Sequence, residues 1–234
     1  MPIAMENGFY QTHDMTDVSC LGIDSRNLSE CIEEIKRKKI KGVFGNPAFG
    51  FNEENLDFLN ELPWIEAIWF WDVSLKNIDG IYALKNLRYF GCHPKRPPIN
   101  FEHFEKLQLV VIEPKAKDTG LCSLSSLEVL HVWHYKPKNK DFLALDAPKS
   151  LIELQINWAN PSSLESLPEL PKLRKLEIYG CRNLEHLGEL HAKYPNLEHL
   201  MVSACGKVTK SEAERTIKSF KNLKHACIQG KLFP

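Results

Sequence analysis

Leucine-centred triplets recur along most of this chain, and they constrain its fold more than any other feature. Four of them are Leu127-Glu-Val-Leu130-His-Val132, Leu151-Ile-Glu-Leu154-Gln-Ile156, Leu173-Arg-Lys-Leu176-Glu-Ile178 and Leu197-Glu-His-Leu200-Met-Val202. Each is apolar at three spaced residues, which we number 0, +3 and +5. The triplets return every 20 to 26 residues. A self-similar period of this length indicates a stacked solenoid, in which no single repeat buries its own apolar face.

The same register can be followed from the middle of the chain to its C-terminal end. Position 0 holds Ile40 (a weak copy), Ile65, Leu87, Leu107, Leu127, Leu151, Leu173, Leu197 and Leu223. The alternation of +3 and +5 has the two-residue period of a short strand with one buried face. Stacking would place these strands side by side in a parallel sheet. Positions +2, +4 and +6 would then point outward.

This pattern resembles the leucine-rich repeat family, whose consensus is L-x-x-L-x-L-x-x-N/C followed by a variable return. The resemblance covers roughly residues 40 to 230. Cys181 and Cys205 match the N/C position at +8, whereas other repeats depart from it, as Lys115 and Tyr135 do. The resemblance implies an α/β leucine-rich repeat solenoid. It would have a curved parallel β-sheet whose outward strand face is concave, and short helical, 3₁₀ or irregular returns in about eight repeats.

The first 39 residues lack the repeat pattern. We expect an N-terminal cap over 1–39, with a short strand within 15–23 and an amphipathic helix over 25–38 that begins at Ser25 as N-cap. We expect residues 40–234 to form one continuous solenoid domain. Residues 209–220 are expected to form a short helix, with Ser211 in its N-terminal signal.

Composition narrows the class of protein. Thirty basic and thirty acidic side chains give a formal charge of zero, so no global field attracts nucleic acid or an anionic membrane. No apolar stretch approaches the ~20 residues that span a bilayer, and the N-terminus lacks the features of a signal peptide. The seven cysteines are odd in number and sit mostly at apolar positions. The sequence therefore predicts a reduced, cytoplasmic protein that is a monomer when free.

The outward positions are unusually apolar in the first half of the repeats. We predict a partner-binding surface there and list its apolar members: Trp69, Trp71, Tyr89, Leu109, Val111, Val129 and Trp133. A contiguous exposed apolar patch marks an interaction site, and tryptophan and tyrosine are enriched among binding hot spots. Two alternatives are that the register shifts here, or that a terminal segment folds over this face and buries it. Trp64 and Trp158 lie off these columns, and we expect them to pack inside.

A polar border continues this face toward the C-terminus. Its members are predicted to tune partner selectivity through charge matching: Glu113, His131, Glu153, Glu177 and Tyr179. The alternative is that they are solvated charges on an open sheet.

Basic residues follow the strands in three consecutive repeats. Stacking would bring them to one rim: Lys95, Arg96, Lys115, Lys117, Lys136, Lys138 and Lys140. Such a rim could grip phosphates or an acidic protein surface, although charged loops are more often simply solvated.

Signals for catalysis are poor, because the chain has no glycine-rich phosphate loop, no G-x-S-x-G and no H-E-x-x-H. We therefore predict a binding protein that needs no metal or cofactor and engages a protein partner through its concave sheet. Some free-standing leucine-rich repeat proteins act as bacterial adaptors or as immunity partners that inhibit a toxin. The resemblance implies a role of this kind for this chain. The alternatives are a nucleic-acid or acidic-ligand module that uses the basic rim, and a plain scaffold.

Overall fold

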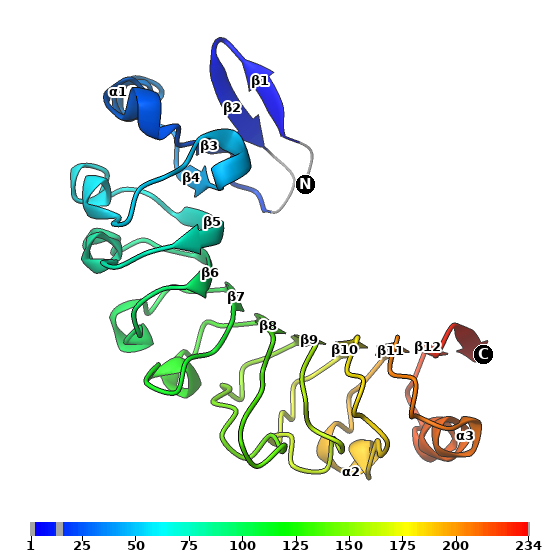
Figure 1. Cartoon of the computed structure of the whole chain (residues 1–234). Helices are drawn as coiled ribbons and strands as arrows, with labels where there is room; N and C mark the ends of the chain where they lie inside the picture. Colours follow the sequence, from blue (N-terminus) through cyan, green and yellow to red (C-terminus); the bar gives the residue numbers. More distant parts are fainter. Residues whose placement is uncertain (1–2, 13–15, 234) are drawn as a thin grey trace. The chain divides into compact units, whose positions relative to one another are not determined.

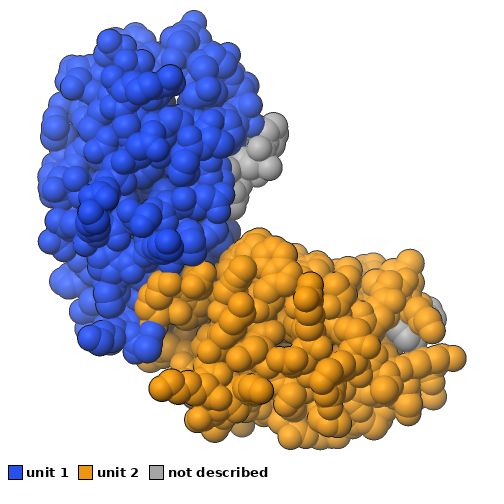
Figure 2. All heavy atoms as spheres, viewed as in Figure 1, with its two compact units in different colours: residues 1–112, 116–119 blue, residues 113–115, 120–234 orange. Residues whose placement is uncertain are grey.

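The computed structural model describes residues 3–12 and 16–233 of the chain. They form two compact units, coloured separately in Figure 2: unit 1 comprises residues 1–112 and 116–119, and unit 2 comprises residues 113–115 and 120–234. Unit 1 joins the predicted cap with the first repeats, so the compact units do not divide at residue 40. The division into a cap and one continuous solenoid stays a prediction.

Unit 1 consists of seven strands with short helical returns (Figure 1). The strands are β1 (Ala4–Glu6), β2 (Phe9–Thr12), β3 (Cys20–Gly22), β4 (Gly42–Gly45), β5 (Ala67–Ser74), β6 (Tyr89–Lys95) and β7 (Leu109–Ile112). β1, β2 and β3 pair antiparallel, and β3 to β7 pair parallel in chain order. The returns are α1 (Leu28–Lys38) and the 3₁₀ turns Ser25–Asn27, Pro47–Phe49, Asp57–Glu61, Asp79–Ala83 and Phe101–His103.

Unit 2 repeats the same architecture. Its strands are β8 (Val129–Trp133), β9 (Glu153–Asn157), β10 (Lys175–Tyr179), β11 (His199–Ser203), β12 (His225–Ile228) and β13 (Lys231–Phe233). β8 to β12 pair parallel in chain order, and β13 pairs antiparallel with β12. The returns include a 3₁₀ turn (Leu121–Ser123), α2 (Leu190–Lys193) and α3 (Lys210–Ser219). No helix within the described ranges combines the length and apolar character needed to cross a bilayer.

Strand register in each unit follows the repeat columns of the sequence. In unit 1 the +3 residues Val43, Ile68 and Phe90 are direct cross-strand neighbours. In unit 2 Leu154 and Leu176 pair in the same way. All five side chains are fully buried, and full burial of a side chain of this size stabilises by roughly 1.5–3 kcal/mol. The predicted inward positions and the leucine-rich repeat fold are therefore confirmed.

A left-handed turn follows the strands of unit 2 at position +7. His134, Trp158, Gly180 and Ala204 all have positive φ, between 51° and 65°. The backbone N–H of each of the first three donates to the carbonyl at +6 of the next repeat, at 2.8 to 2.9 Å. These hydrogen bonds hold a backbone conformation that non-glycine residues otherwise avoid. The conformation determines where the +7 side chains point.

A strand in the repeat register also lies within the predicted cap. β3 pairs parallel with β4, and Leu21 lies opposite Val43. Val18, Leu21 and Ile23 occupy positions 0, +3 and +5 and are buried. The strand expected within 15–23 is thus a full repeat strand, although its first residue, Met15, lies outside the described residues. The apolar triplet was present in the sequence and was missed.

Both expected helices form, as α1 within 25–38 and α3 within 209–220, but neither Ser25 nor Ser211 is an N-cap residue. Ser25 is not the N-cap of α1; its Oγ accepts a hydrogen bond from the backbone N–H of Asn52 at 2.8 Å, while Asp24 caps the preceding 3₁₀ turn by accepting from the Arg26 N–H. α3 is capped by Thr209, which accepts from the Glu212 N–H at 3.2 Å. Asp24 and Thr209 have the extended backbone that an N-cap requires. Asn27, the N-cap residue of α1, does not, and it makes no side-chain cap hydrogen bond.

Candidate protein-binding surface

The outward face of unit 1 is covered rather than exposed. Trp69, Tyr89 and Val111 are only 4%, 9% and 9% exposed, so the prediction that they form an open apolar patch was wrong. The alternative, a terminal segment folded over the face, is correct for Tyr89, whose hydroxyl donates to Asp17 at 2.6 Å. Trp69 fits closely because its ring lies over Gly91, where an added Cβ would come within 2.5 Å of the indole.

The other two apolar members from unit 1 are only partly accessible. Trp71 is half-buried and stacks on Phe44, with ring centroids 5.7 Å apart. Leu109, the first residue of β7, is also half-buried. The described residues of unit 1 therefore present no broad apolar surface.

The basic residues do not all belong to a solvent-exposed rim. The side chain of Arg96 is 0% exposed and forms a bidentate pair with Asp118, with both N–O distances 2.7 Å. Its Nε also donates to the Cys92 carbonyl at 3.2 Å. Arg96 is therefore a structural residue of unit 1, and its assignment to the rim was wrong. A buried guanidinium requires such a partner, because desolvation of an unpaired charge is costly.

The remaining rim residues are lysines. In unit 2, the Lys115 ammonium pairs with Glu113 at 3.2 Å, so this predicted selectivity residue is engaged within its own unit. The other lysines are exposed, two in unit 1 and three in unit 2: Lys95, Lys117, Lys136, Lys138 and Lys140. Their role in binding stays a prediction.

The outward face of unit 2 carries a ladder of polar contacts across three strands, with charges of alternating sign on β9 and β10. Glu153 on β9 accepts a hydrogen bond from His131 Nε2 at 3.1 Å and pairs with Lys175 on β10 at 3.2 Å. Lys175 also pairs with Glu177 at 3.3 Å. The hydrogen bond from His131, with the neighbouring Lys175, lowers the pKa of Glu153. Because each charge has fixed partners, this part of the face is polar and already ordered.

The ladder continues to the next strand, β11. His199 on β11 lies 3.5 Å from Glu177. Tyr179, the last residue of β10, is half-buried, and burial followed by its contact with Glu177 raises its pKa. The polar border predicted from the sequence is thus a set of contacting side chains in unit 2, apart from Glu113.

An aromatic cluster stands at the carboxyl ends of β8 and β9. Trp158 is 47% exposed, and its ring lies edge-to-face against Trp133 with centroids 4.8 Å apart. His134 also contacts Trp158, at 5.2 Å between centroids. The expectation that Trp158 packs inside was wrong, because its left-handed backbone directs the ring away from the core. The sequence signal that could have found it is a tryptophan at +7 followed by glycine at +7 of the next repeat.

We call this area of unit 2 the ladder face. Its members are Val129, His131, Trp133, Glu153, Trp158, Lys175, Glu177, Tyr179 and His199. Val129 is half-buried at the start of β8.

Among the described residues, no group of histidine, cysteine or acidic side chains could hold a metal ion. The two cysteines at +8, Cys181 and Cys205, are buried within the turns after β10 and β11, as the consensus position predicted.

Comparison with known proteins gives similarity in fold alone. No family model matches the chain, and no curated protein sequence matches it. One similar solved structure is an internalin (inlF) from Listeria monocytogenes, 14% identical with a TM-score of 0.49, over 88% of this chain and 64% of that one. Another is the leucine-rich repeat domain of the type III effector XopL, 18% identical with a TM-score of 0.40, over 81% and 61%. The chain therefore spans less than two thirds of the length of either structure.

The chain's own strands carry the assignment of fold. In each unit the apolar columns of the sequence become adjacent buried positions of a parallel sheet, and each strand is followed by a short return to the next. This arrangement is what a leucine-rich repeat produces when its copies stack. The chain therefore has the fold of a leucine-rich repeat solenoid.

Proposed function

We propose that this chain is a protein-binding module and that its partner docks on the ladder face of unit 2. The observation that carries the proposal is Trp158, which the fold holds 47% exposed against Trp133. Tryptophan is the residue type most enriched among binding hot spots. The left-handed backbone of Trp158 and the hydrogen bond from its N–H to the Tyr179 carbonyl fix its position, so little conformational entropy would be lost on binding.

The charge ladder beside the cluster supplies selectivity. Glu153 and Glu177 alternate with Lys175 in a fixed pattern, and a partner must match it or leave charges unpaired. Aromatic anchors beside a polar border have the composition of a protein–protein interface. The function is therefore one of recognition by a preformed surface, and we assign no catalytic step to it.

The test is a comparison of capture from a native lysate by the full-length chain and two variants. Trp158→Ala removes the exposed ring, and the matched control Leu143→Ala removes a side chain that is 78% exposed in the return between β8 and β9. We expect a partner retained by the wild type and the control, and bound roughly 30-fold more weakly by Trp158→Ala, as for a hot spot of about 2 kcal/mol. Equal binding by all three folded proteins would place the interface elsewhere.

The finer proposal is inhibition of the bound partner, as in a bacterial toxin-immunity pair, by a monomeric protein in the cytoplasm. It is tested once a partner is purified, by measuring the partner's activity with increasing amounts of the chain. Loss of activity at one-to-one stoichiometry supports inhibition. Unchanged activity in a stable complex supports the plain scaffold instead.

A second candidate is an acidic ligand, including nucleic acid, bound by the exposed lysines. Lys136, Lys138 and Lys140 lie together in one exposed return of unit 2, which favours this reading for that loop. Salt separates the two candidates, because contacts to phosphates weaken steeply with ionic strength and aromatic anchoring does not. Binding that survives a high salt concentration and depends on Trp158 would exclude the lysine loop as the main site.

A further inference from the structure

Two cysteine side chains contact each other in neighbouring turns of unit 2. Cys181 and Cys205 each stand two residues after the end of a strand, β10 or β11. These strands pair parallel, with Tyr179 opposite Ser203, and the two thiols beyond them are joined by a hydrogen bond. The pair lies within unit 2, and its chemistry is independent of the function proposed for the ladder face.

The repeat brings the two cysteines to a spacing that suits a disulfide bridge. Each cysteine follows its strand through a left-handed residue, Gly180 in one repeat and Ala204 in the next. The Gly180 N–H donates to the Ser203 carbonyl at 2.9 Å, so the chains stay paired past the ends of the strands. Paired strands lie about 4.8 Å apart, and this spacing falls within the roughly 4.4–6.8 Å that separates the Cα atoms of disulfide-bonded cysteines.

The contact makes the two thiols chemically unequal. The hydrogen bond from the Cys181 thiol lowers the pKa of Cys205 against the opposing effect of burial, and the backbone N–H groups of Cys181 and Gly180 lower it further. The same contact, together with burial, raises the pKa of Cys181. Because the thiolate is the reactive form of cysteine, Cys205 is the thiol that reacts first with an oxidant, and Cys181 lies beside it to resolve the product.

The pair is buried but lies close to solvent. Cys181 and Cys205 are only 2% and 0% exposed, whereas Arg182, Ala204 and Gly206 beside them in the chain are all exposed. Nothing lies within 4 Å of a Cβ added at Gly206, so the outer side of this turn is open. A local opening of these surface turns would admit a molecule as small as hydrogen peroxide without unfolding the strands.

We propose that Cys181 and Cys205 are an oxidisable pair, which a peroxide converts into a disulfide bridge between two repeats. In the first step the Cys205 thiolate attacks one oxygen of hydrogen peroxide, the O–O bond breaks, hydroxide leaves and a sulfenic acid remains. In the second step the Cys181 sulfur gives up its proton and attacks the Cys205 sulfur, and the sulfenic hydroxyl leaves with that proton as water. The two thiols together lose two electrons, and the peroxide is reduced to water.

The first test uses the wild-type, full-length protein in its folded state. The reduced protein is treated with hydrogen peroxide, the remaining thiols are blocked with N-ethylmaleimide, and the cysteine peptides are identified by mass spectrometry. We expect a linked peptide that joins Cys181 to Cys205 and has lost both thiol hydrogens. The bridge restricts the unfolded chain, so the unfolded fraction at a fixed urea concentration should fall on the order of 100-fold.

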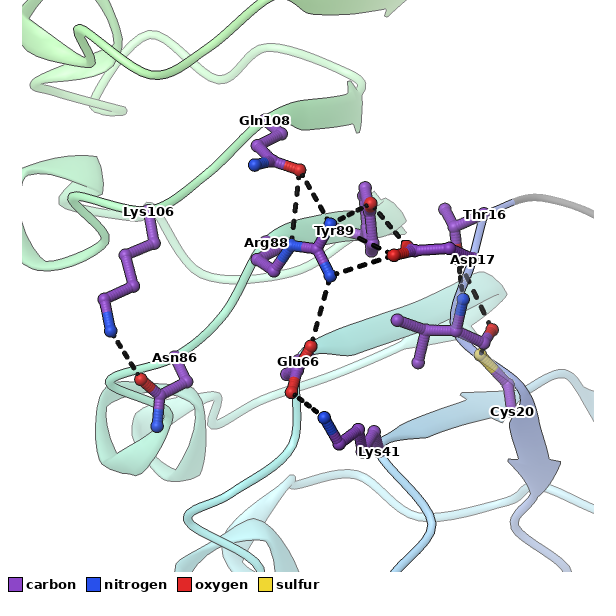
Figure 3. A network of polar contacts seen from close by, with 11 residues as sticks. Thr16, Asp17, Cys20, Lys41, Glu66, Asn86, Arg88, Tyr89, Lys106 and Gln108 are labelled. Carbon is purple, nitrogen blue, oxygen red and sulfur yellow. Dashed lines mark hydrogen bonds and ion pairs between the residues drawn. The ribbon is translucent and has the colours of Figure 1, made fainter.

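Cys20 of unit 1 is a matched internal control. It is 3% exposed, and its thiol donates to the Val18 carbonyl at 3.6 Å, as Figure 3 shows. Cys181 makes the same kind of contact with the Tyr179 carbonyl, also at 3.6 Å. The residue opposite Cys20 on the next strand is Gly42 and not a cysteine, so Cys20 should be recovered as the maleimide adduct.

Two variants separate the pair from general oxidation of cysteine. Cys205→Ser removes the first nucleophile and should abolish both the linked peptide and the gain in stability. Cys122→Ser removes an exposed cysteine and should change neither. Recovery of Cys181 and Cys205 unlinked from folded wild type in which Cys122 is already oxidised would overturn the proposal without recourse to a variant. A linked peptide that forms only in urea would also overturn it, since the folded turns would then hold the thiols apart.

Discussion

Trp158 lies directly over Gly180 of the next repeat, where an added Cβ would come within 2.4 Å of the indole ring. Gly180 also has a φ of 65°. Glycine is thus required at position 180 for two reasons: the backbone is left-handed, and the neighbouring ring leaves no space for a Cβ. The exposed tryptophan of one repeat is therefore positioned by the glycine of the next.

Gly180→Ala should both strain the turn and move Trp158. We expect a loss of about 1–2 kcal/mol of stability, the cost of a left-handed backbone for a residue with a Cβ. A change in tryptophan emission should accompany it. Urea unfolding followed by fluorescence measures both. The control is Gly206→Ala, because nothing lies within 4 Å of its added Cβ. Equal losses in the two variants would contradict the steric role of Gly180.

Arg96 should behave as a core residue despite its charge. Arg96→Met removes the bidentate partner of Asp118, whose side chain is 10% exposed, and breaking a buried pair of this kind typically costs about 3–5 kcal/mol. The same substitution at its exposed neighbour, Lys95→Met, should change the free energy of unfolding by less than about 0.5 kcal/mol. Thermal and urea unfolding give both values.

The double variant Arg96→Met, Asp118→Asn tests the reason for that loss. Replacing the aspartate removes the carboxylate charge that Arg96 neutralises, so we expect the double variant to be more stable than Arg96→Met alone. The Asp118 carboxylate accepts a hydrogen bond from the Ile99 N–H at 2.9 Å, and the amide oxygen that replaces it can still accept this bond. A double variant that is no more stable than Arg96→Met would show that the arginine acts mainly through packing and not through its charge.

Glu153 should make the stability of unit 2 depend on pH. Its pKa in the folded protein is lowered, first by the hydrogen bond from His131 and then by Lys175. The carboxylate therefore stabilises the fold above its unfolded pKa near 4.5, and this contribution is lost as the pH falls through the lower, folded pKa.

The comparison is between the wild type and Glu153→Gln in urea at neutral pH and at a pH well below the unfolded pKa. We expect the variant to be less stable by about 1 kcal/mol at neutral pH, as for one charge-assisted hydrogen bond, and the difference to shrink toward zero in acid. Glu128→Gln, an exposed position on the strand entry before β8, should show no such convergence. A difference that persists undiminished in acid would mean that Glu153 acts through shape and not charge.

The repeat architecture could be predicted because its signals are local. A two-residue alternation sets which side of each strand is buried, and the 20 to 26 residue period sets which strands align. The register of Leu154 with Leu176 and the burial of Cys181 follow from these rules. The polar contact of His131 with Glu153 follows too, because both occupy outward positions of neighbouring strands.

Local patterns are sufficient to predict the repeats, their register and the strand face that each residue occupies. Which outward residues meet solvent depends on tertiary contacts. Tyr89 is covered by Asp17, 72 positions away, and no local pattern specifies where a terminal segment will pack. Arg96 is buried because Asp118 follows one repeat later, so a charged loop in the sequence becomes part of a core. Trp158 is exposed because its backbone is left-handed and Gly180 makes room for its ring. Exposure depends on contacts between distant residues, and these form only when the repeats have stacked.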